Sequence, residues 1–387
     1  MRAFTVTAAA LGTLAAIYPY VFVVMALVAG SLVDTLGPRR TLALGGAAMG
    51  AGAVVFGLAP VFGVAVAGRL AVGLGASVVL IAFLALAAEW FRPDEFATVS
   101  GLSQTIGNLG GLVAASPLAV LVEVIGWRRS FVVIGALTCL LGLLALFAVR
   151  DRPEPLQTSR SRAPRVGEVL RGVPAVVRNA RTWPPILAAG GVYATLITFQ
   201  GLWGVPYLVQ VYGLSRVRAA ALVSAIAVGV IAGAPLAGWI SDRWLRARRL
   251  PFVVSAALYA GCWLPLVIPA WRPPLELLAP FFFVMGLTSC GLVLVWSCVR
   301  EVNDPSRVGI VVGFCNMPIF LLFAVLQWLT GVILDAGWAG GLADGMRLYP
   351  LPAWTAAFGA CLVLALVAVS AATRITETRC RNVWGDH

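Results

Sequence analysis

Long apolar runs alternate with short polar segments along almost the whole chain. Most of the runs are long enough to cross a bilayer as a helix, which takes about 20 residues. We place them at 8–30, 41–60, 62–88, 99–122, 129–149, 184–209, 218–240, 251–270, 275–299, 308–333 and 353–373. A backbone in lipid has to satisfy its own hydrogen bonds, so such runs form helices. The pattern predicts an all-α, polytopic membrane protein with eleven visible transmembrane helices.

The composition agrees with this prediction. Hydrophobic residues make up 60% of the 387 residues, charged residues make up 11%, and the mean hydropathy is +0.94. The formal net charge of +12 comes from arginine, because the sequence contains no lysine. The arginines gather in loops on one side of the predicted spans, which the positive-inside rule identifies as the cytoplasm. We therefore expect a multi-pass protein of a bacterial inner membrane, with no nucleic acid as partner.

One polar turn occurs twice in the sequence. In both copies a glycine ends an apolar run, an aspartate follows one helical turn later, and arginines precede the next run. The members are Gly30, Asp34, Gly37, Arg39 and Arg40 in the first copy and Gly238, Asp242 and Arg243 in the second. The repeat predicts two transmembrane halves, 1–149 and 184–373. A basic cytoplasmic linker at 150–183 joins them, and a cytoplasmic tail follows at 374–387.

The aspartates of these turns need partners. Asp34 lies near the end of its predicted helix, where a negative charge is unfavourable unless an arginine or another helix N-terminus compensates it. We expect Arg92, at the cytoplasmic corner after the third run, to pair with Asp34, and Asp242 with Arg243 to act likewise in the second half. Gly30 is expected to let its helix end approach a neighbour closely. Together these residues would form a latch that a domain movement can break.

The first turn resembles the signature loop of the major facilitator superfamily of secondary transporters. The family's loop has a glycine, an aspartate, a second glycine and a basic pair, which Gly30, Asp34, Gly37, Arg39 and Arg40 match. Thr35 stands where the family has a basic residue, a departure within the charge network of the loop. A second motif of the family is matched by Arg69, Gly73, Gly75 and Ala76.

The resemblance implies two six-helix halves that move a small organic solute, of the metabolite or organic-anion class, by alternating access. It also implies twelve spans, so the family's first helix is missing from the visible pattern. A gene start placed too far downstream and a naturally eleven-span chain both account for this difference. The alternative functions are a non-transporting membrane sensor and an inactive remnant of a transporter.

Several polar side chains fall inside predicted spans, where they need a partner or a solute. The candidates for solute binding are Arg69, Asn108, Tyr193, Gln200, Trp203, Trp296 and Asn316. Arg69 is the sharpest of them, because an arginine within a span is costly unless it is paired or faces water. By the resemblance it lies near the central cavity. Its other interpretation is that it snorkels to the outer surface.

The remaining candidates have structural alternatives as well. Tyr193 and Gln200 would share one face of an α-helix and suit a small organic solute, or they would form hydrogen bonds between helices. For Trp203 and Tyr207 we favour an aromatic belt at the membrane interface. Asn316 precedes a Met-Pro pair, where a proline frees a backbone carbonyl as in the broken helices of binding sites.

The sequence also argues against several chemistries. No aspartate or glutamate lies in the middle of a predicted span, so the sequence leaves open whether a proton or another ion is coupled to transport. Without lysine there is no Gly-x-x-x-x-Gly-Lys phosphate loop, which excludes ATP-driven transport on this chain. The cysteines lack metal-ligand spacing, and the only histidine is His387. We expect no cofactor, no metal and no enzymatic activity, with a small-molecule solute and the lipid bilayer as partners.

Overall fold

A computed structural model describes residues 7–25, 29–90, 106–107, 110, 118, 120–151, 173–305, 308–343 and 346–385. Within these residues, ten helices are long and apolar enough to cross a membrane. The predicted span at 99–122 lies mostly outside them, as do Arg92 and Asn108 and the side chains of Gly30 and Asp34. The all-α prediction is confirmed, with one small exception. Strands β1 (Leu342–Ala343) and β2 (Met346–Arg347) pair in the loop before the last helix.

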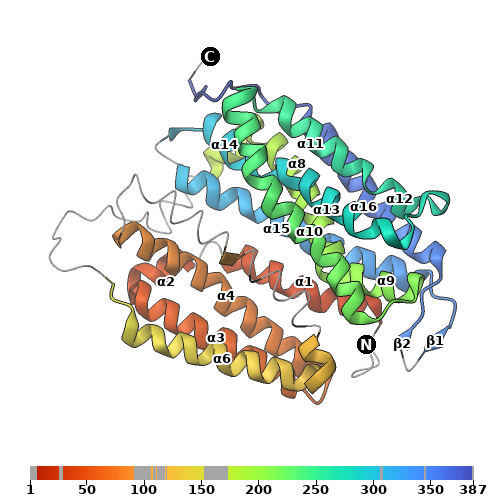
Figure 1. The fold of residues 1–387 in the computed structure, drawn as a ribbon. Coiled ribbons are helices and arrows are strands. Elements are labelled where there is room, and N and C mark those ends of the chain that lie inside the picture. Colours follow the sequence, from red (N-terminus) through yellow and green to blue (C-terminus); the bar gives the residue numbers. More distant parts are fainter. Residues whose placement is uncertain are drawn as a thin grey trace. The chain divides into compact units, whose positions relative to one another are not determined.

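The helices fall into two compact units. Unit 2 comprises residues 17–113 and 120–171. Its elements are the later part of α1 (Ala8–Met25), α2 (Ala29–Leu36), α3 (Pro38–Leu58), α4 (Phe62–Trp90) and α6 (Trp127–Ala148). Helix α3 packs against both α4 and α6 (Figure 1). Gly75 of the second motif makes this packing possible, because a Cβ on it would lie 2.5 Å from the Met49 nitrogen of α3.

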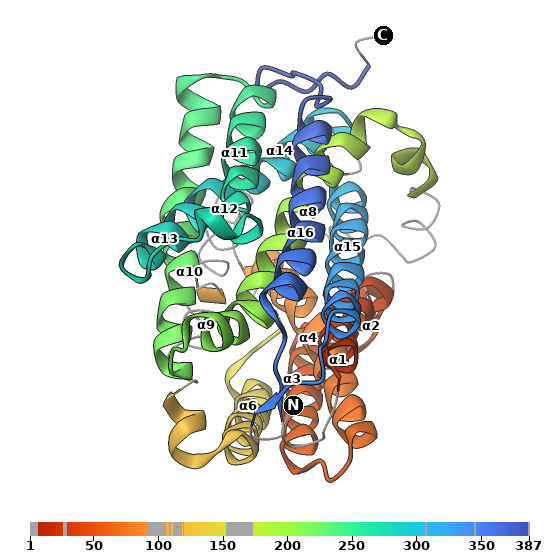
Figure 2. The same cartoon turned by 90° about the vertical axis from the view of Figure 1, so that its right-hand side faces the viewer.

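Unit 1 comprises residues 1–16, 114–119 and 172–387. Its main elements are α8 (Trp183–Thr198), α9 (Gly204–Tyr212), α10 (Arg216–Trp239), α11 (Arg249–Gly261), α12 (Leu264–Val267), α13 (Leu278–Ser289), α14 (Val295–Glu301), α15 (Val308–Ala336) and α16 (Leu351–Ala372). Helix α8 lies against α15 and α16, and α10 lies against α13 (Figure 2). The first turns of α1 therefore belong to unit 1, while its last turns belong to unit 2.

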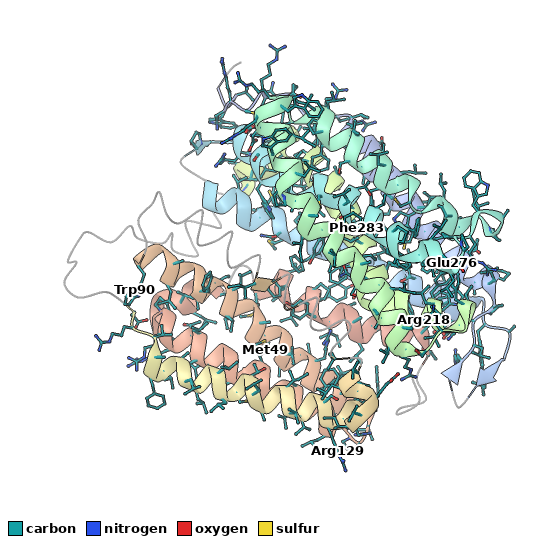
Figure 3. All side chains as sticks on the ribbon, in the orientation of Figure 1. Met49, Trp90, Arg129, Arg218, Glu276 and Phe283 are labelled. Carbon is teal, nitrogen blue, oxygen red and sulfur yellow. The ribbon has the colours of Figure 1, made fainter. Side chains whose placement is uncertain are left out.

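Charged side chains stand at the ends of the spans. Arg129 lies in the first turn of α6, Arg218 lies in the first turn of α10, and Glu276 precedes α13 (Figure 3). This placement follows from the cost of a charge in hydrocarbon, which confines most charged residues to the boundaries of the bilayer.

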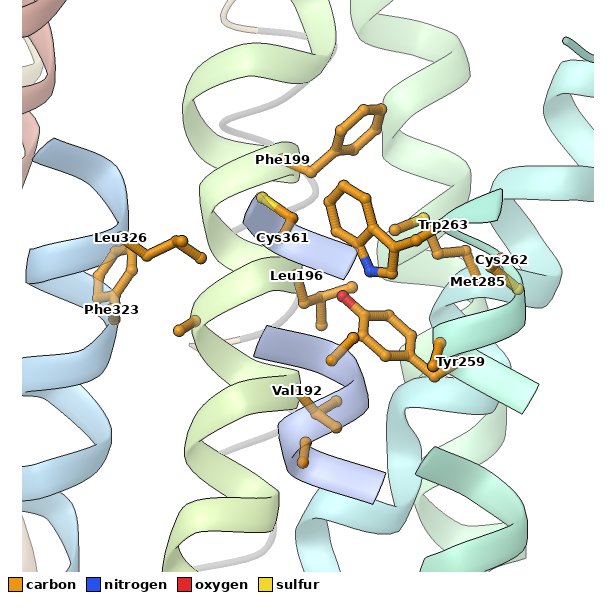
Figure 4. Packing of buried hydrophobic residues seen from close by; sticks show 14 of the residues in the cluster. Val192, Leu196, Phe199, Tyr259, Cys262, Trp263, Met285, Phe323, Leu326 and Cys361 are labelled. Carbon is orange, nitrogen blue, oxygen red and sulfur yellow. The ribbon is translucent and has the colours of Figure 1, made fainter. Parts of the chain in front are cut away.

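An aromatic cluster fills the core of unit 1. Phe199, Tyr259 and Trp263 pack together beside the small Cys361 (Figure 4). Trp203 and Tyr207 belong to the same core, and each is only 1% exposed. The prediction that these two side chains form an interfacial belt is therefore wrong. Belt residues face lipid headgroups, whereas Trp203 and Tyr207 are covered by Trp354 of α16.

Two helical irregularities change the predicted geometry. A π-helical turn, Phe199–Trp203, follows α8, so the uniform α-helical spacing assumed for Tyr193, Gln200 and Trp203 does not hold. A second π turn, Ile240–Trp244, follows α10. Pro318, by contrast, lies inside α15 without ending it, so the helix continues past the proline, in agreement with the single span predicted at 308–333.

The two repeat glycines do not end their helices. Gly30 is the second residue of α2, and the helix continues to Leu36. Gly37 comes next and has φ of +82°, a conformation that glycine adopts without steric cost. The prediction that Gly30 ends its helix is wrong, because Gly37 supplies the turn. Gly238 is followed by one more α-helical residue and the π turn, and a Cβ on it would meet no atom within 4 Å.

Candidate functional site

Arg69 meets an aromatic ring inside unit 2. Helix α4 carries Arg69, which is half-buried, and α1 carries Tyr18. The guanidinium carbon lies 6.0 Å from the centre of the Tyr18 ring, at the outer limit of a cation–π contact. Among the residues that the structure describes, no carboxylate forms an ion pair with Arg69. The positive charge in the span is therefore only weakly compensated by these described side chains.

Unit 1 buries several polar groups in the middle of its spans. The Trp203 indole N–H donates to the Thr330 hydroxyl over 2.8 Å, and Thr330 donates to the Leu326 carbonyl. The Thr198 hydroxyl and the Gln327 amide oxygen are also buried, but neither has a partner among the described atoms. Thr198 and Thr330 were not predicted from the sequence, because helical threonines commonly bond their own backbone.

The other predicted solute contacts are spread over unit 1. The Tyr193 ring packs against Phe320 and Phe323 of α15, each with 5.8 Å between ring centres. Gln200 lies within the π turn and Asn316 lies half-buried in α15. Trp296 of α14 is 37% exposed. The contacts thus join α15 to α8 through Tyr193 and to the π turn after α8 through Trp203, while Trp296 lies toward the surface of the unit.

The first polar turn is closed by an aspartate from the end of α6. Asp151 accepts a hydrogen bond from the backbone N–H of Arg39 over 2.7 Å, which caps the N-terminus of α3. The Arg39 guanidinium donates to the Leu146 carbonyl, while its Nε is buried without a partner in the described part of the chain. Arg40 is exposed. The capping carboxylate was missed because it lies 112 positions away in sequence.

The second polar turn holds a buried arginine instead. Arg248 bonds both oxygens of Glu301 over 3.1 Å from Nε, and its Nη2 lies 2.7 Å from Oε1. Arg248 also pairs with Asp242 and donates to the Ser241 hydroxyl. The partner of Asp242 is therefore Arg248, whereas the predicted Arg243 is exposed.

The chain after α16 completes this network. The Glu377 carboxylate accepts the backbone N–H groups of Arg248 and Arg249 over 2.9 and 3.0 Å, capping α11. The Thr378 hydroxyl donates to Glu301. Val383 donates its backbone N–H to the Glu301 carbonyl over 2.8 Å. The segment predicted as a tail is therefore packed on the turn and holds its buried carboxylate in place.

These contacts shift the ionisation of the groups. Burial lowers the pKa of Arg248, but its hydrogen bonds to Glu301 and Asp242 outweigh that effect and raise the pKa above its usual range. Burial raises the pKa of Glu377, yet the backbone N–H groups of Arg248, Arg379 and Arg249 bring it below its ordinary value. Both groups are therefore fully charged at neutral pH.

The described residues contain no candidate metal-binding site. Within them, no three histidine, cysteine, aspartate or glutamate side chains are grouped so that they could hold a metal ion. The buried cysteines lie singly in the helices of unit 1 or, for Cys262, directly after one, as small apolar residues do.

Long apolar helices in two compact units, each with a copy of the same polar turn, define a multi-pass helical membrane protein with an internal repeat. The model of the Major Facilitator Superfamily matches residues 1–321, and the chain belongs to this family.

Similar proteins match the chain at low sequence identity. The chain is 25% identical to the membrane sensor protein UhpC of Salmonella typhimurium, over 67% of this chain and 62% of that protein. It is 22% identical to a probable hexose phosphate transport protein of Chlamydia muridarum, over 70% and 66%. It thus spans just under two thirds of the length of these relatives. A bacterial homologue of the lysosomal transporter Spinster, in an inward-facing conformation, matches with a TM-score of 0.70 at 18% identity, over 96% of this chain and 88% of that one.

Proposed function

We propose that this protein transports a small organic anion across the bacterial cytoplasmic membrane by alternating access. The observation that carries the proposal is Arg69, an arginine within a span whose described neighbour is the Tyr18 ring. Family membership and the likeness to a probable hexose phosphate transport protein support it.

The energetics favour an anion as the missing partner. An arginine at the centre of a transmembrane helix costs about 3 kcal/mol on insertion scales, and Arg69, which lies nearer the start of α4 than its centre, bears part of that cost. A cation–π contact supplies about 0.5–2 kcal/mol, and less at the limit of its range. The difference has to be met by water or by an anion, and a carboxylate or phosphate can bond a guanidinium through two parallel hydrogen bonds. Arg69 is therefore the residue that we expect to select negatively charged solutes.

The other candidates would shape the solute's remaining contacts. We propose that Asn108, Tyr193, Gln200, Trp296 and Asn316 contribute hydrogen bonds or stacking, and that the buried Trp203 supports this site through its hydrogen bond to Thr330. Such groups fix the orientation of a solute, whereas the charged residue supplies most of the attraction. Their substitution by alanine should raise KM within the same solute class.

Uptake into proteoliposomes tests the proposal. Purified protein is reconstituted and assayed with radiolabelled hexose phosphates, other organic anions and neutral sugars, with and without an imposed proton gradient. We expect saturable uptake of an anion that Arg69→Gln reduces at least tenfold, that Arg69→Lys partly restores, and that Arg129→Gln leaves unchanged because Arg129 is exposed. Uptake by Arg69→Gln equal to that of the unmodified protein would overturn the role of Arg69.

A sensor is the second candidate, because the membrane sensor protein UhpC is among the relatives. A sensor would bind the anion without moving it across the membrane. Saturable binding by the detergent-solubilised protein combined with no flux from two-sided reconstitution would favour this candidate over transport.

A further inference from the structure

The span from α13 to α14 changes its helical form halfway. A 3₁₀ stretch, Cys290–Leu294, lies between the two α-helices. Such stretches bond each N–H to the carbonyl three residues earlier and rarely run longer than four residues. A break in a helix has a local cause, such as a proline or a side chain that inserts into the backbone hydrogen bonds. The only proline of this span, Pro280, lies in the first turn of α13, so another group accounts for the change.

The Ser255 hydroxyl of α11 inserts at this point. It accepts the backbone N–H of Gly291 over 2.7 Å and donates to the Thr288 carbonyl over 2.6 Å. The Leu287 carbonyl, which an α-helix would offer to Gly291, accepts the N–H of Cys290 instead. One hydroxyl thus bonds both a donor and an acceptor of the backbone where the helical form changes.

Glycine at position 291 admits this hydroxyl. A Cβ on Gly291 would lie 2.4 Å from Ser255 Oγ, closer than two such atoms approach. On the other side of the stretch, Cys290 Sγ lies 3.4 Å from the Val230 carbonyl oxygen of α10, and a Cβ on Gly233 would lie 2.6 Å from that sulfur. The stretch is therefore held between α10 and α11, and all three belong to unit 1.

The 3₁₀ stretch sets the rotation of α14 relative to α13. Each 3₁₀ residue turns the chain by about 120°, against about 100° in an α-helix, so five residues add about 100°. With this rotation α14 buries Cys298 and Glu301, which are 2% and 4% exposed, and turns Trp296 outward at 37%. Without it, Cys298 would point out of the core and Glu301 would point away from Arg248.

We propose that Ser255 is a positioning residue that fixes the rotation of α14 by stabilising the 3₁₀ stretch. An N–H without a partner is costly inside a bilayer, so the hydroxyl favours the 3₁₀ form over a continuous α-helix, in which Gly291 has an acceptor of its own. Ser255 thereby acts on Glu301 of the buried ion pair and on Trp296 of the solute site. The effect on Trp296 rests on the proposed function, whereas the rotation of α14 does not.

Alkylation of Cys298 in lipid nanodiscs reports the rotation without requiring transport. Ser255→Ala removes the hydroxyl, so the α form becomes favoured and Cys298 turns out of the core. We expect N-ethylmaleimide to label Cys298 on the order of tenfold faster, because labelling of a buried thiol follows the population in which it is accessible. Cys315 of α15 and Cys361 of α16, which are also buried, should keep their rates.

Three further variants sharpen this measurement. Ser224→Ala is the matched control, because the Ser224 hydroxyl bonds the Ala221 carbonyl of its own helix α10, and it should leave the labelling of Cys298 unchanged. Gly291→Ala places a methyl group where the Ser255 hydroxyl lies and should accelerate labelling as Ser255→Ala does. Ser255→Thr keeps a hydroxyl and should restore most of the protection.

Two results would overturn the proposal outright. One is labelling of Cys298 at the unmodified rate in both Ser255→Ala and Gly291→Ala. The other is equal acceleration at Cys298, Cys315 and Cys361, which is general loosening of unit 1. Labelling in Ser255→Thr as fast as in Ser255→Ala would assign the effect to packing and overturn the role of the hydroxyl.

Uptake into proteoliposomes separates this proposal from the proposed function. If Trp296 contacts the solute, Ser255→Ala should raise KM more than it lowers the maximal rate. Faster labelling of Cys298 with an unchanged KM supports the positioning of α14 and removes Trp296 from the solute site. Faster labelling in a protein that shows no uptake at all supports the positioning role and counts against transport alone.

Discussion

The two copies of the polar turn share one feature and differ in another. In unit 2, Asp151 follows α6 and caps the start of α3. In unit 1, Glu377 follows α16 and caps the start of α11. Each unit thus uses a carboxylate that follows its last helix to close the helix after the repeated turn. The repeat therefore extends beyond the turn itself to a contact that the local sequence does not reveal.

The arginines of the two turns behave differently. Arg39 donates to the Leu146 carbonyl, whereas the side chain of Arg248 is buried between Asp242 and Glu301. The second turn is also one residue longer, because Asp242 is one position farther from the capped N–H of Arg248 than Asp34 is from that of Arg39. The π turn Ile240–Trp244 takes up this residue, since an i→i+5 turn holds one more than an α-turn. The comparison teaches that the cap is common to both units and that the buried ion pair is described only in unit 1.

The largest effect is expected from Glu301→Ala, which breaks the ion pair of unit 1. It leaves Arg248 buried beside the mostly exposed Asp242, and breaking a buried pair costs about 3–5 kcal/mol. Thermal unfolding can be followed by labelling Cys262, Cys290, Cys298, Cys315 and Cys361, which are buried in unit 1, with a thiol-reactive fluorophore. Glu276→Ala serves as the exposed control, and equal midpoints for the two variants would contradict the prediction.

Gly37→Ala should have the next largest effect, and it tests the turn of unit 2. A non-glycine residue held at such a φ costs about 1–3 kcal/mol. Arg246, in the second turn, has φ of +45°, so Arg246→Gly relieves strain there and should not destabilise unit 1. Labelling of Cys139, which contacts Gly50 across α3 and α6, measures unit 2 by mass spectrometry. If Cys139 is labelled no faster in Gly37→Ala than in the unmodified protein, glycine at this positive φ does not contribute to the stability of unit 2.

Removal of the two caps compares them directly. Loss of an N-cap costs about 0.5–2 kcal/mol. Glu377→Ala should lie toward the upper end because Glu377 accepts two N–H groups of α11, while Asp151→Ala loses one. The same cysteine labelling, resolved by peptide, measures both. A larger effect of Asp151→Ala on its own unit would reverse the expected order.

The smallest effect is the pH dependence of the unit 1 cap. The folded pKa of Glu377 is below its ordinary value, so its stabilisation is present above the unfolded pKa of about 4.3 and is lost as the pH falls through the folded pKa. The unfolding midpoints of the unmodified protein and Glu377→Gln should therefore differ at pH 7 and converge once the pH falls below the folded pKa of Glu377. A difference that persists in acid would assign the effect of Glu377→Gln to packing.

Local patterns predicted the spans well and the contacts poorly. The apolar runs at 41–60 and 353–373 became α3 and α16 within a few residues, and Gly75 proved to be a contact glycine. The prediction of an aromatic belt was wrong for Trp203 and Tyr207, because hydropathy does not tell which face of a helix packs against another helix. The predicted partner of Asp242 was wrong for a related reason. Arg248 reaches Asp242 only because the π turn and Arg246, which has a positive φ, redirect the chain.

The sequence by itself determined the membrane-spanning helices, the repeat and the family, because bilayer thickness and backbone hydrogen bonding act on each segment separately. Only the tertiary structure decided which carboxylate meets which helix start. Asp151, Glu377 and Asp335 each reach backbone N–H groups more than a hundred positions away. A helix N-terminus attracts any nearby carboxylate, so which carboxylate binds depends on how the helices pack. The sequence shows the order of the helices along the chain but not their positions in space.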